Sequence, residues 1–184
     1  MLELSIQVLS KGDVPDVDEL VIDAANHVVG RLASTVATLA LKGKRVVIVN
    51  AEKAVVTGDF NSILEQFKVK LTIVRTHYNP ERTGPKTPRR PDRVLRRAIR
   101  GMLPYDKQKG KAALGRIKIY LGTPASYYNK PKYVVKGAYF HMIPGSPYTT
   151  LEDIWRSIDP KTWAVWRESY DKFKKAIEKK GEQK

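Results

Sequence analysis

Hydrophobic residues follow two alternating spacings over residues 20–49 and predict a strand, a helix and a second strand. Residues 20–22 are a short apolar run, and residues 45–49 contain a continuous β-branched run, which is typical of a strand buried on both faces. Between these runs, apolar side chains recur at helical spacing: Val29, Leu32, Ala33, Val36 and Ala40. Gly43 follows as a helix C-terminal cap would. A strand, helix and strand in about thirty residues predict a right-handed βαβ unit.

The alternation continues beyond this unit and predicts two further strands and two further helices. The expected elements are a strand over residues 54–57, a helix opening at Gly58–Asp59, a loop rich in proline and glycine over residues 77–91, a helix over residues 92–103 and a strand over residues 117–121. Residues 69–74 suit either an extension of the second helix or extended chain. With the βαβ unit, these elements predict an α/β fold: a three-layer α/β/α sandwich on a mostly parallel, four-stranded sheet.

The chain beyond Gly122 carries weaker signals and predicts extended chain followed by helices. Residues 133–135 are a strand candidate, Thr149 to Glu152 suggests a capping box, and Asp159–Pro160 suggests a helix start. An aromatic stripe at helical spacing follows: Trp163, Trp166, Tyr170, Phe173 and Ile177. Docking of this stripe on its own domain is favoured over a protein-partner site.

Four regions follow from these patterns. They are an acidic N-terminal extension over residues 1–19, an α/β core domain over residues 20–124, an extended loop region over residues 125–148 and a helical C-terminal extension over residues 149–184.

The charge of the chain points to a polyanionic partner. Lys and Arg number 34 against 19 Asp and Glu, which gives a net charge of +15 and a pI near 9.9, whereas solubility alone rarely needs more than about 8 charges. Residues 75–118 hold fourteen basic and three acidic residues, a net of +11, whereas the first 25 residues have a net of −5. This asymmetry predicts one face built for nucleic acid or an anionic membrane.

Several classes of protein are excluded or disfavoured by composition. The chain has no cysteine, which excludes disulfides and cysteine-ligated zinc and fits a reducing, intracellular setting. It has no apolar run of about 18 residues, so we expect no transmembrane helix. The acidic residues near the N-terminus argue against a targeting segment.

The helix expected over residues 92–103 separates arginine from apolar residues. At about 100° per residue, one face carries four arginines: Arg93, Arg96, Arg97 and Arg100. The opposite face carries the apolar side chains: Leu95, Ala98, Ile99 and Met102. We therefore expect the apolar face to pack on the sheet and the guanidinium groups to point outward, where their forked donors suit phosphate.

Basic residues on both sides of this helix extend the expected site. Lys86, Arg89 and Arg90 precede it, and Lys107, Lys109 and Lys111 follow it, with Gly110 placed to let a phosphate approach the backbone. Arg31, Lys42 and Lys44 are also expected to contact RNA. Three other interpretations of the helix remain open: a membrane-surface helix, a solvated charged face, and an enzyme's phosphate-binding loop. The absence of any Gly-rich phosphate motif weighs against the last.

Catalytic and metal-binding signals are missing from the sequence. The three histidines are isolated, without metal-ligand spacing, and no G-x-S-x-G elbow occurs. Asp23 and Asp59 lie at expected turns between strand and helix, where we interpret them as caps rather than ligand-binding residues. His27 is interpreted as a turn or packing residue. We therefore predict no catalytic residue, no metal and no cofactor.

Several motifs in register resemble the large-subunit ribosomal protein thirteen family, in its archaeal and eukaryotic branch. The resemblance runs from about residue 20 to residue 124 and rests on these motifs: Gly30-Arg31-Leu32-Ala33-Ser34, Asn50-Ala51-Glu52-Lys53, Thr57-Gly58 and Gly101-Met102-Leu103-Pro104. It implies a non-enzymatic structural component of the large ribosomal subunit that binds 23S-type rRNA through the arginine-rich helix and its basic flanks.

The resemblance also implies the partners and the location. The expected partners are large-subunit rRNA and neighbouring large-subunit proteins, with no membrane and no small-molecule substrate, in the cytoplasm on the ribosome. Two alternatives stay open from the residues alone. One is an RNA-binding regulator outside the ribosome, and the other is a nucleotide-dependent enzyme acting on RNA, with a pocket near Asp23 and Thr57.

Overall fold

A parallel β-sheet forms the centre of the protein. The computed structural model describes residues 6–9, 15, 17–74, 76–79, 82–140 and 146–182. The central strands are β1 (Ile6–Leu9), β2 (Glu19–Asp23), β3 (Arg45–Val49), β5 (Ile117–Ile119) and β6 (Lys132–Val135). They lie in the order β1-β6-β2-β3-β5, and every pair is parallel. The predicted mostly parallel α/β fold is confirmed, but the sheet has five strands rather than four.

The predicted strand over residues 54–57 is not part of the central sheet. This segment, β4 (Val55–Thr57), pairs antiparallel with β7 (Tyr148–Thr150) in a separate two-stranded sheet. Both neighbours of β3 are already taken by β2 and β5. Asn50 adopts a left-handed conformation at φ 55°, and a short 3₁₀ turn, η1 (Ala51–Lys53), leads the chain away from the sheet edge.

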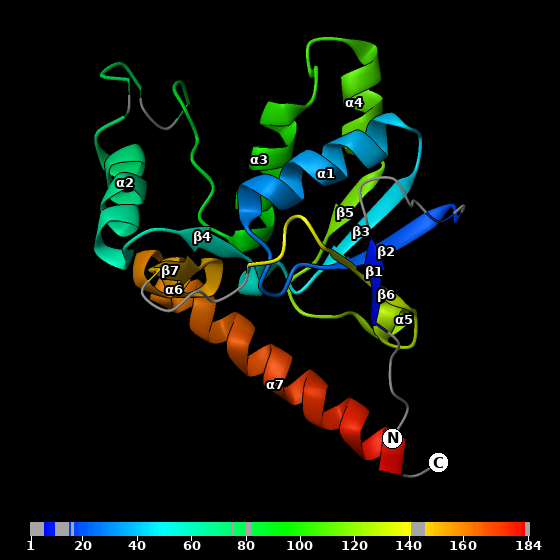
Figure 1. Cartoon of the computed structure of the whole chain (residues 1–184). Helices are drawn as coiled ribbons and strands as arrows, with labels where there is room; N and C mark the ends of the chain where they lie inside the picture. Colours follow the sequence, from blue (N-terminus) through cyan, green and yellow to red (C-terminus); the bar gives the residue numbers. More distant parts are fainter. Residues whose placement is uncertain are drawn as a thin grey trace.

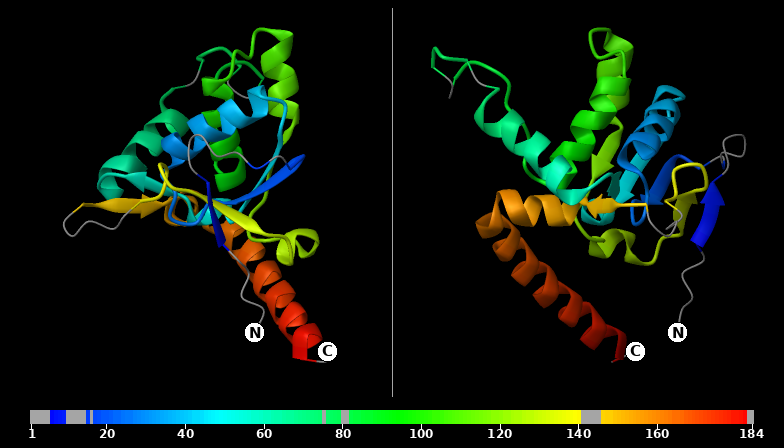
Figure 2. Two further views of the ribbon diagram at one scale, coloured as in Figure 1. Left: turned by 45° about the vertical axis from the view of Figure 1, so that its right-hand side comes forward. Right: turned by 60° about the vertical axis from the view of Figure 1, so that its left-hand side comes forward.

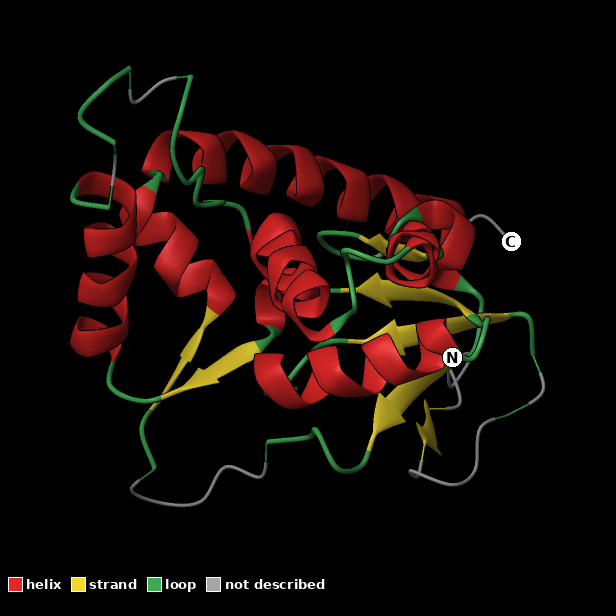
Figure 3. Cartoon of the chain, turned by 90° about the horizontal axis from the view of Figure 1, so that it is seen from above, coloured by secondary structure: helices red, strands yellow, loops and turns green. Residues whose placement is uncertain are grey.

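Helices flank the central sheet on both sides (Figures 1 and 2). The helices α1 (Val29–Leu41), α3 (Pro91–Met102) and α4 (Gln108–Gly115) lie on one side, and α5 (Ala125–Tyr128) and α7 (Pro160–Glu182) lie on the other. The remaining helices, α2 (Phe60–Thr72) and α6 (Leu151–Ile158), lie to one side of the sheet with β4 and β7, as seen from above in Figure 3.

The core is divided between the two faces of the sheet, as the unbroken apolar runs of β2 and β3 predict. Alternate residues such as Ile22 and Ile48 join the main cluster with α1 and α3. Their neighbours Val21 and Val47 face the other way and pack with Tyr127 of α5. Side chains on both faces of these strands are therefore buried.

The C-terminal helices dock on the α/β core through aromatic rings. The buried Trp155 lies with its ring centroid 5.3 Å from that of Trp166, which stacks on Tyr170 at 5.4 Å. The Tyr170 ring lies against Gly122, where a Cβ atom would overlap it. The expectation that the aromatic stripe docks on its own domain therefore holds for its first half, whereas Phe173 further along is 37% exposed.

The predicted start of α7 is confirmed, and that of α6 is displaced by one residue. Asp159 Oδ1 accepts a hydrogen bond from the Thr162 amide, and α7 begins at Pro160. The cap of α6 is Thr150 rather than Thr149, because the Thr150 hydroxyl accepts from the Asp153 amide at 3.2 Å. Thr149 is buried within β7, so the neighbouring Thr150 caps the helix instead.

Candidate nucleic-acid interface

The helix α3 has the two faces that its spacing predicts, with one exception. Leu95 and Ile99 are fully buried against the core, and the four arginines of α3 (Arg93, Arg96, Arg97 and Arg100) are exposed. The prediction that Met102 is buried is wrong, because its side chain is 45% exposed. Met102 is the last residue of the helix, and Leu103, immediately after it, enters the core instead.

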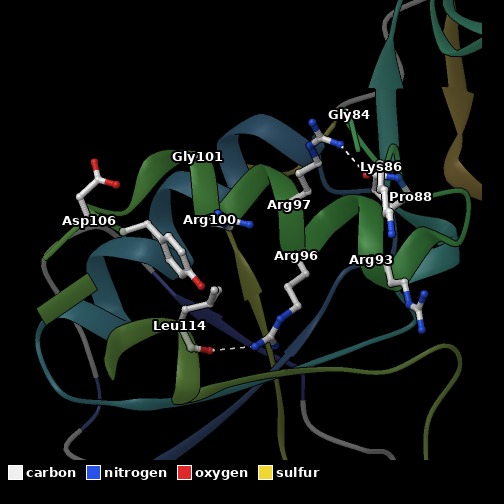
Figure 4. A pocket seen from close by; sticks show the side chains of 11 residues that line it. Gly84, Lys86, Pro88, Arg93, Arg96, Arg97, Arg100, Gly101, Asp106 and Leu114 are labelled. Carbon is white, nitrogen blue, oxygen red and sulfur yellow. Dashed lines mark hydrogen bonds between the residues drawn. The ribbon is translucent and has the colours of Figure 1, made fainter. Parts of the chain in front are cut away.

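An open groove runs along the arginine-bearing face of α3, between the preceding loop and α4. This α3–α4 groove has a volume of about 840 Å³ and is lined by Gly84, Lys86, Pro88, Arg93, Arg96, Arg97, Arg100, Gly101, Tyr105, Asp106 and Leu114. Figure 4 shows Lys86, Pro88 and Arg93 at one end and Asp106 at the other. Among the described residues, five cations and a single carboxylate line the groove, so it attracts anions.

Three of the four arginines of α3 are held in place by the protein itself. Arg96 donates from Nη1 to the Ile117 carbonyl at 3.0 Å. It also donates from Nη2 to the Leu114 carbonyl at 3.4 Å (Figure 4). Arg97 donates to the Lys86 carbonyl at 3.1 Å. Each guanidinium has five N–H donors, so these contacts fix the side chains and still leave donors for a ligand.

The third held arginine, Arg100, contacts an aromatic ring. Its guanidinium carbon lies 4.0 Å from the centroid of the Tyr105 ring, within the range of a cation–π interaction. The Arg93 guanidinium and the Lys86 ammonium, by contrast, have no hydrogen bond, ion pair or ring contact within the described part of the chain. The groove therefore combines pre-positioned guanidinium groups with two free cations at one end.

The structure brings together only part of the set of expected RNA-binding residues. Lys86 and the four arginines of α3 line the α3–α4 groove. The others are accessible to different degrees but lie outside its lining: Arg31, Lys42, Lys44, Arg89, Arg90, Lys107, Lys109 and Lys111. Arg90 is engaged with Asp92 at 3.3 Å, an exposed ion pair. These eight residues remain candidates for contacts around the groove.

Gly110 has a structural explanation that the sequence did not suggest. It is buried in the first turn of α4, and a Cβ atom there would overlap the carbonyl oxygen of Pro104. The close approach that glycine permits is therefore between α4 and the preceding loop, rather than between the backbone and a phosphate.

Two groove residues, Tyr105 and Asp106, were missed by the sequence analysis. Both follow α3 directly in the loop to α4, and both line the groove. Their position in the sequence could have identified them, because an aromatic and an acidic residue stand there between two basic segments.

The carboxyl end of the central sheet, where the alternative hypothesis places a nucleotide pocket, holds a network of hydrogen bonds among its own residues. Asp23 Oδ1 accepts from the Ala25 amide at 3.0 Å and from Asn50 Nδ2 at 2.9 Å, so Asp23 caps a turn rather than a helix. The amide of Gly122 donates to Glu52 Oε2 at 2.9 Å. Burial raises the pKa of the Glu52 carboxyl. Asp59 caps α2, as expected.

His27 is a packing residue, as the sequence analysis interprets it. It is fully buried, and its Nε2 accepts from the Val135 amide at 3.0 Å while Nδ1 lies 2.9 Å from the Ala25 carbonyl. An accepting Nε2 leaves Nδ1 as the donor in the neutral ring. Burial lowers the pKa of His27, which keeps the ring neutral.

The described residues form neither a membrane-spanning helix nor a cluster of metal ligands. No helix there combines the length and the apolar character that crossing a membrane requires. No group of three potential ligand side chains gathers there as a metal site.

Comparisons with known proteins agree on one family. Residues 18–126 match the family Ribosomal protein L13. Proteins named "Large ribosomal subunit protein uL13" from Pyrobaculum islandicum and Pyrobaculum aerophilum are each 44% identical to this chain, over 169 and 174 residues. The first alignment covers 89% of this chain and 91% of the relative, and the second covers 92% and 93%. The protein of that name from Methanococcoides burtonii is 41% identical over 141 residues, or 77% of this chain and 98% of the relative.

Proposed function

The chain belongs to the ribosomal protein L13 family, and on this premise we propose that it binds 23S-type rRNA through the α3–α4 groove and its basic surroundings. The family is structural and non-enzymatic, and its members are named as ribosomal proteins of the large subunit. The proposed role is to hold neighbouring rRNA segments together and so to support subunit assembly and translation.

One observation carries the proposal: a rigid helix presents four arginines in one groove. The buried face of α3 fixes the helix on the core, and three of the guanidinium groups are held by carbonyl groups or by a ring. Like charges this close repel one another, and a row of phosphates offsets that repulsion. Because the side chains are already positioned, little rotamer entropy is lost on binding.

The free cations at one end of the groove give the sharpest test. We expect Arg93→Glu to weaken binding of the purified protein to a transcript of the large-subunit rRNA and to reduce the slope of log K against log salt by about one. Lys136→Glu is the matched control, because it makes the same change of charge away from the groove. Lys136 follows β6, which β2 and β3 separate from β5 in the sheet.

The control separates a specific site from general attraction. If the groove binds rRNA, Arg93→Glu loses much more affinity than Lys136→Glu at the same salt concentration. Equal losses in the two variants would mean that net charge, not the groove, governs binding, and the proposal would then be wrong.

The proposed partners also include neighbouring large-subunit proteins, on ribosomes in the cytoplasm. Supporting this, α2 projects from the core with Val69 and Ile73 exposed, the latter at 72% (Figure 1). Eight basic residues outside the groove lining, from Arg31 to Lys111, are proposed as additional rRNA contacts. They lie on α1 and α4 or in the segments next to α1, α3 and α4.

A further inference from the structure

The first observation is a glycine in the groove that no contact within the protein requires. Gly101 lies in the last turn of α3 and is exposed, and a Cβ atom built there would meet no atom within 4 Å. It has no positive φ, so the usual reason for a glycine near a helix end does not apply. Glycine is otherwise among the least favourable residues in a helix.

The second observation is the one carboxylate that the described residues contribute to the groove lining, that of Asp106. Asp106 is exposed and has no hydrogen bond or ion pair among the described residues, although five cations line the same groove. A carboxylate repels phosphate, so this end of the groove is unsuited to the RNA backbone charge. It is suited to a hydrogen-bond donor, because an ionised carboxylate only accepts.

The third observation is the ring beside these residues. Tyr105 also lines the groove, with the planar guanidinium of Arg100 over its ring at 4.0 Å. Aromatic rings and guanidinium planes are the surfaces on which unstacked RNA bases commonly pack. One end of the groove thus combines three features: open space at Gly101, an aromatic ring at Tyr105 and a hydrogen-bond acceptor at Asp106.

We propose that the two ends of the α3–α4 groove bind different parts of one rRNA strand: a phosphate at one end, and the sugar and base of a nearby nucleotide at the other. The end at Lys86 and Arg93 binds phosphate. The end at Gly101, Tyr105 and Asp106 holds the sugar and base of an unpaired nucleotide, with Asp106 accepting a hydrogen bond from the ribose 2′-hydroxyl or a base amino group. The groove volume of about 840 Å³ leaves room for a nucleotide. This inference rests on the proposed function.

The glycine is tested with a variant that favours the fold. Gly101→Ala places a methyl group where the ligand lies, so we expect rRNA affinity to fall about tenfold while the melting temperature stays the same or rises. Gly115→Ala is the matched control, because Gly115 is also an exposed helix glycine whose Cβ would meet nothing within 4 Å, and it does not line the groove. It should bind rRNA like the wild type.

The carboxylate is tested against the electrostatic expectation. Asp106→Ala removes a negative charge from a basic groove, and charge alone would therefore strengthen rRNA binding. If Asp106 accepts a hydrogen bond from the nucleotide, the variant binds more weakly. The probe is the rRNA fragment that the wild-type protein protects from nuclease, together with DNA of the same sequence. Loss of the preference for RNA over DNA assigns the 2′-hydroxyl, and an equal loss for both assigns a base amino group.

The outcomes separate this inference from the proposed function. The inference is overturned, and the rRNA site stays intact, if the wild type binds rRNA and Gly101→Ala binds it equally well. The same holds if Asp106→Ala binds rRNA more tightly than the wild type. Failure of the wild-type protein to bind rRNA overturns the proposed function itself. Weaker binding by both variants, with Gly115→Ala unaffected, supports the inference.

Discussion

The four arginines of α3 differ in what already holds their guanidinium groups. The Arg93 guanidinium has no partner among the described residues, whereas that of Arg96 donates to carbonyl groups in the last turn of α4 and at the start of β5. Spacing along the sequence places all four on one face, but it cannot distinguish them, because the carbonyl groups that Arg96 meets lie 18 and 21 residues away. A residue on a ligand-binding face can therefore also join two elements of the fold.

This difference predicts unequal effects of the same substitution on stability. Arg96→Glu removes two hydrogen bonds and places a carboxylate beside two carbonyl groups, so the free energy of unfolding should fall by about 1–2 kcal/mol. Arg93→Glu should change it by no more than about 0.5 kcal/mol. Urea unfolding of both variants checks this, and equal stabilities would show that the Arg96 contacts contribute nothing.

The buried His27 predicts a pH dependence with a definite sign. Its pKa is lowered by burial, so the folded protein keeps the ring neutral while the unfolded chain protonates below about 6.5. The stability that His27 contributes is present above that pH and is lost as the pH falls towards 5.

The comparison that isolates this effect is the wild type against His27→Gln. The gap in unfolding free energy between the two should narrow as the pH falls from 7 to 5. Glu52, whose pKa burial raises, has the opposite dependence but is present in both proteins, so it does not affect the gap. A gap that is constant or widens at acidic pH contradicts the role given to His27.

At the scale of elements, periodicity predicts those helices and strands whose partners are close in the chain. The βαβ unit of β2, α1 and β3 and the two faces of α3 follow from apolar spacing. The pairing of β4 with β7 and the addition of β1 and β6 to the central sheet do not follow from apolar spacing. A strand of three or four residues fits either sheet equally well. Long-range pairing decides between them.

The packing of α4 on the loop after α3 leads to a prediction about Gly110. Gly110→Ala brings a methyl group into the Pro104 carbonyl, so we expect a loss of about 1–3 kcal/mol despite the better helix propensity of alanine. In Gly115→Ala, where there is open space, stability should be unchanged or slightly higher. Thermal unfolding of the pair decides, and matching melting temperatures would mean that α4 adjusts freely.

At the scale of the whole molecule, the excess of basic residues lies on the side that carries the α3–α4 groove. Residues 75–118 carry +11 of the net +15, and the folded chain gathers five of these cations around the α3–α4 groove. The sequence predicts the cations and the helix that carries most of them. It does not predict the groove, because its walls come from a loop, two helices and the segment that joins those helices, and only the folded core brings them together.

Cross-linking of rRNA to protein in intact large subunits tests the central claim most directly. After ultraviolet irradiation of subunits containing this protein, mass spectrometry locates the peptides that carry nucleotides. We predict that the cross-links concentrate in residues 84–106, which include the loop, α3 and the residues Tyr105 and Asp106. Cross-links confined to α7 or to the opposite side of the sheet, with residues 84–106 free of nucleotides, would contradict the account.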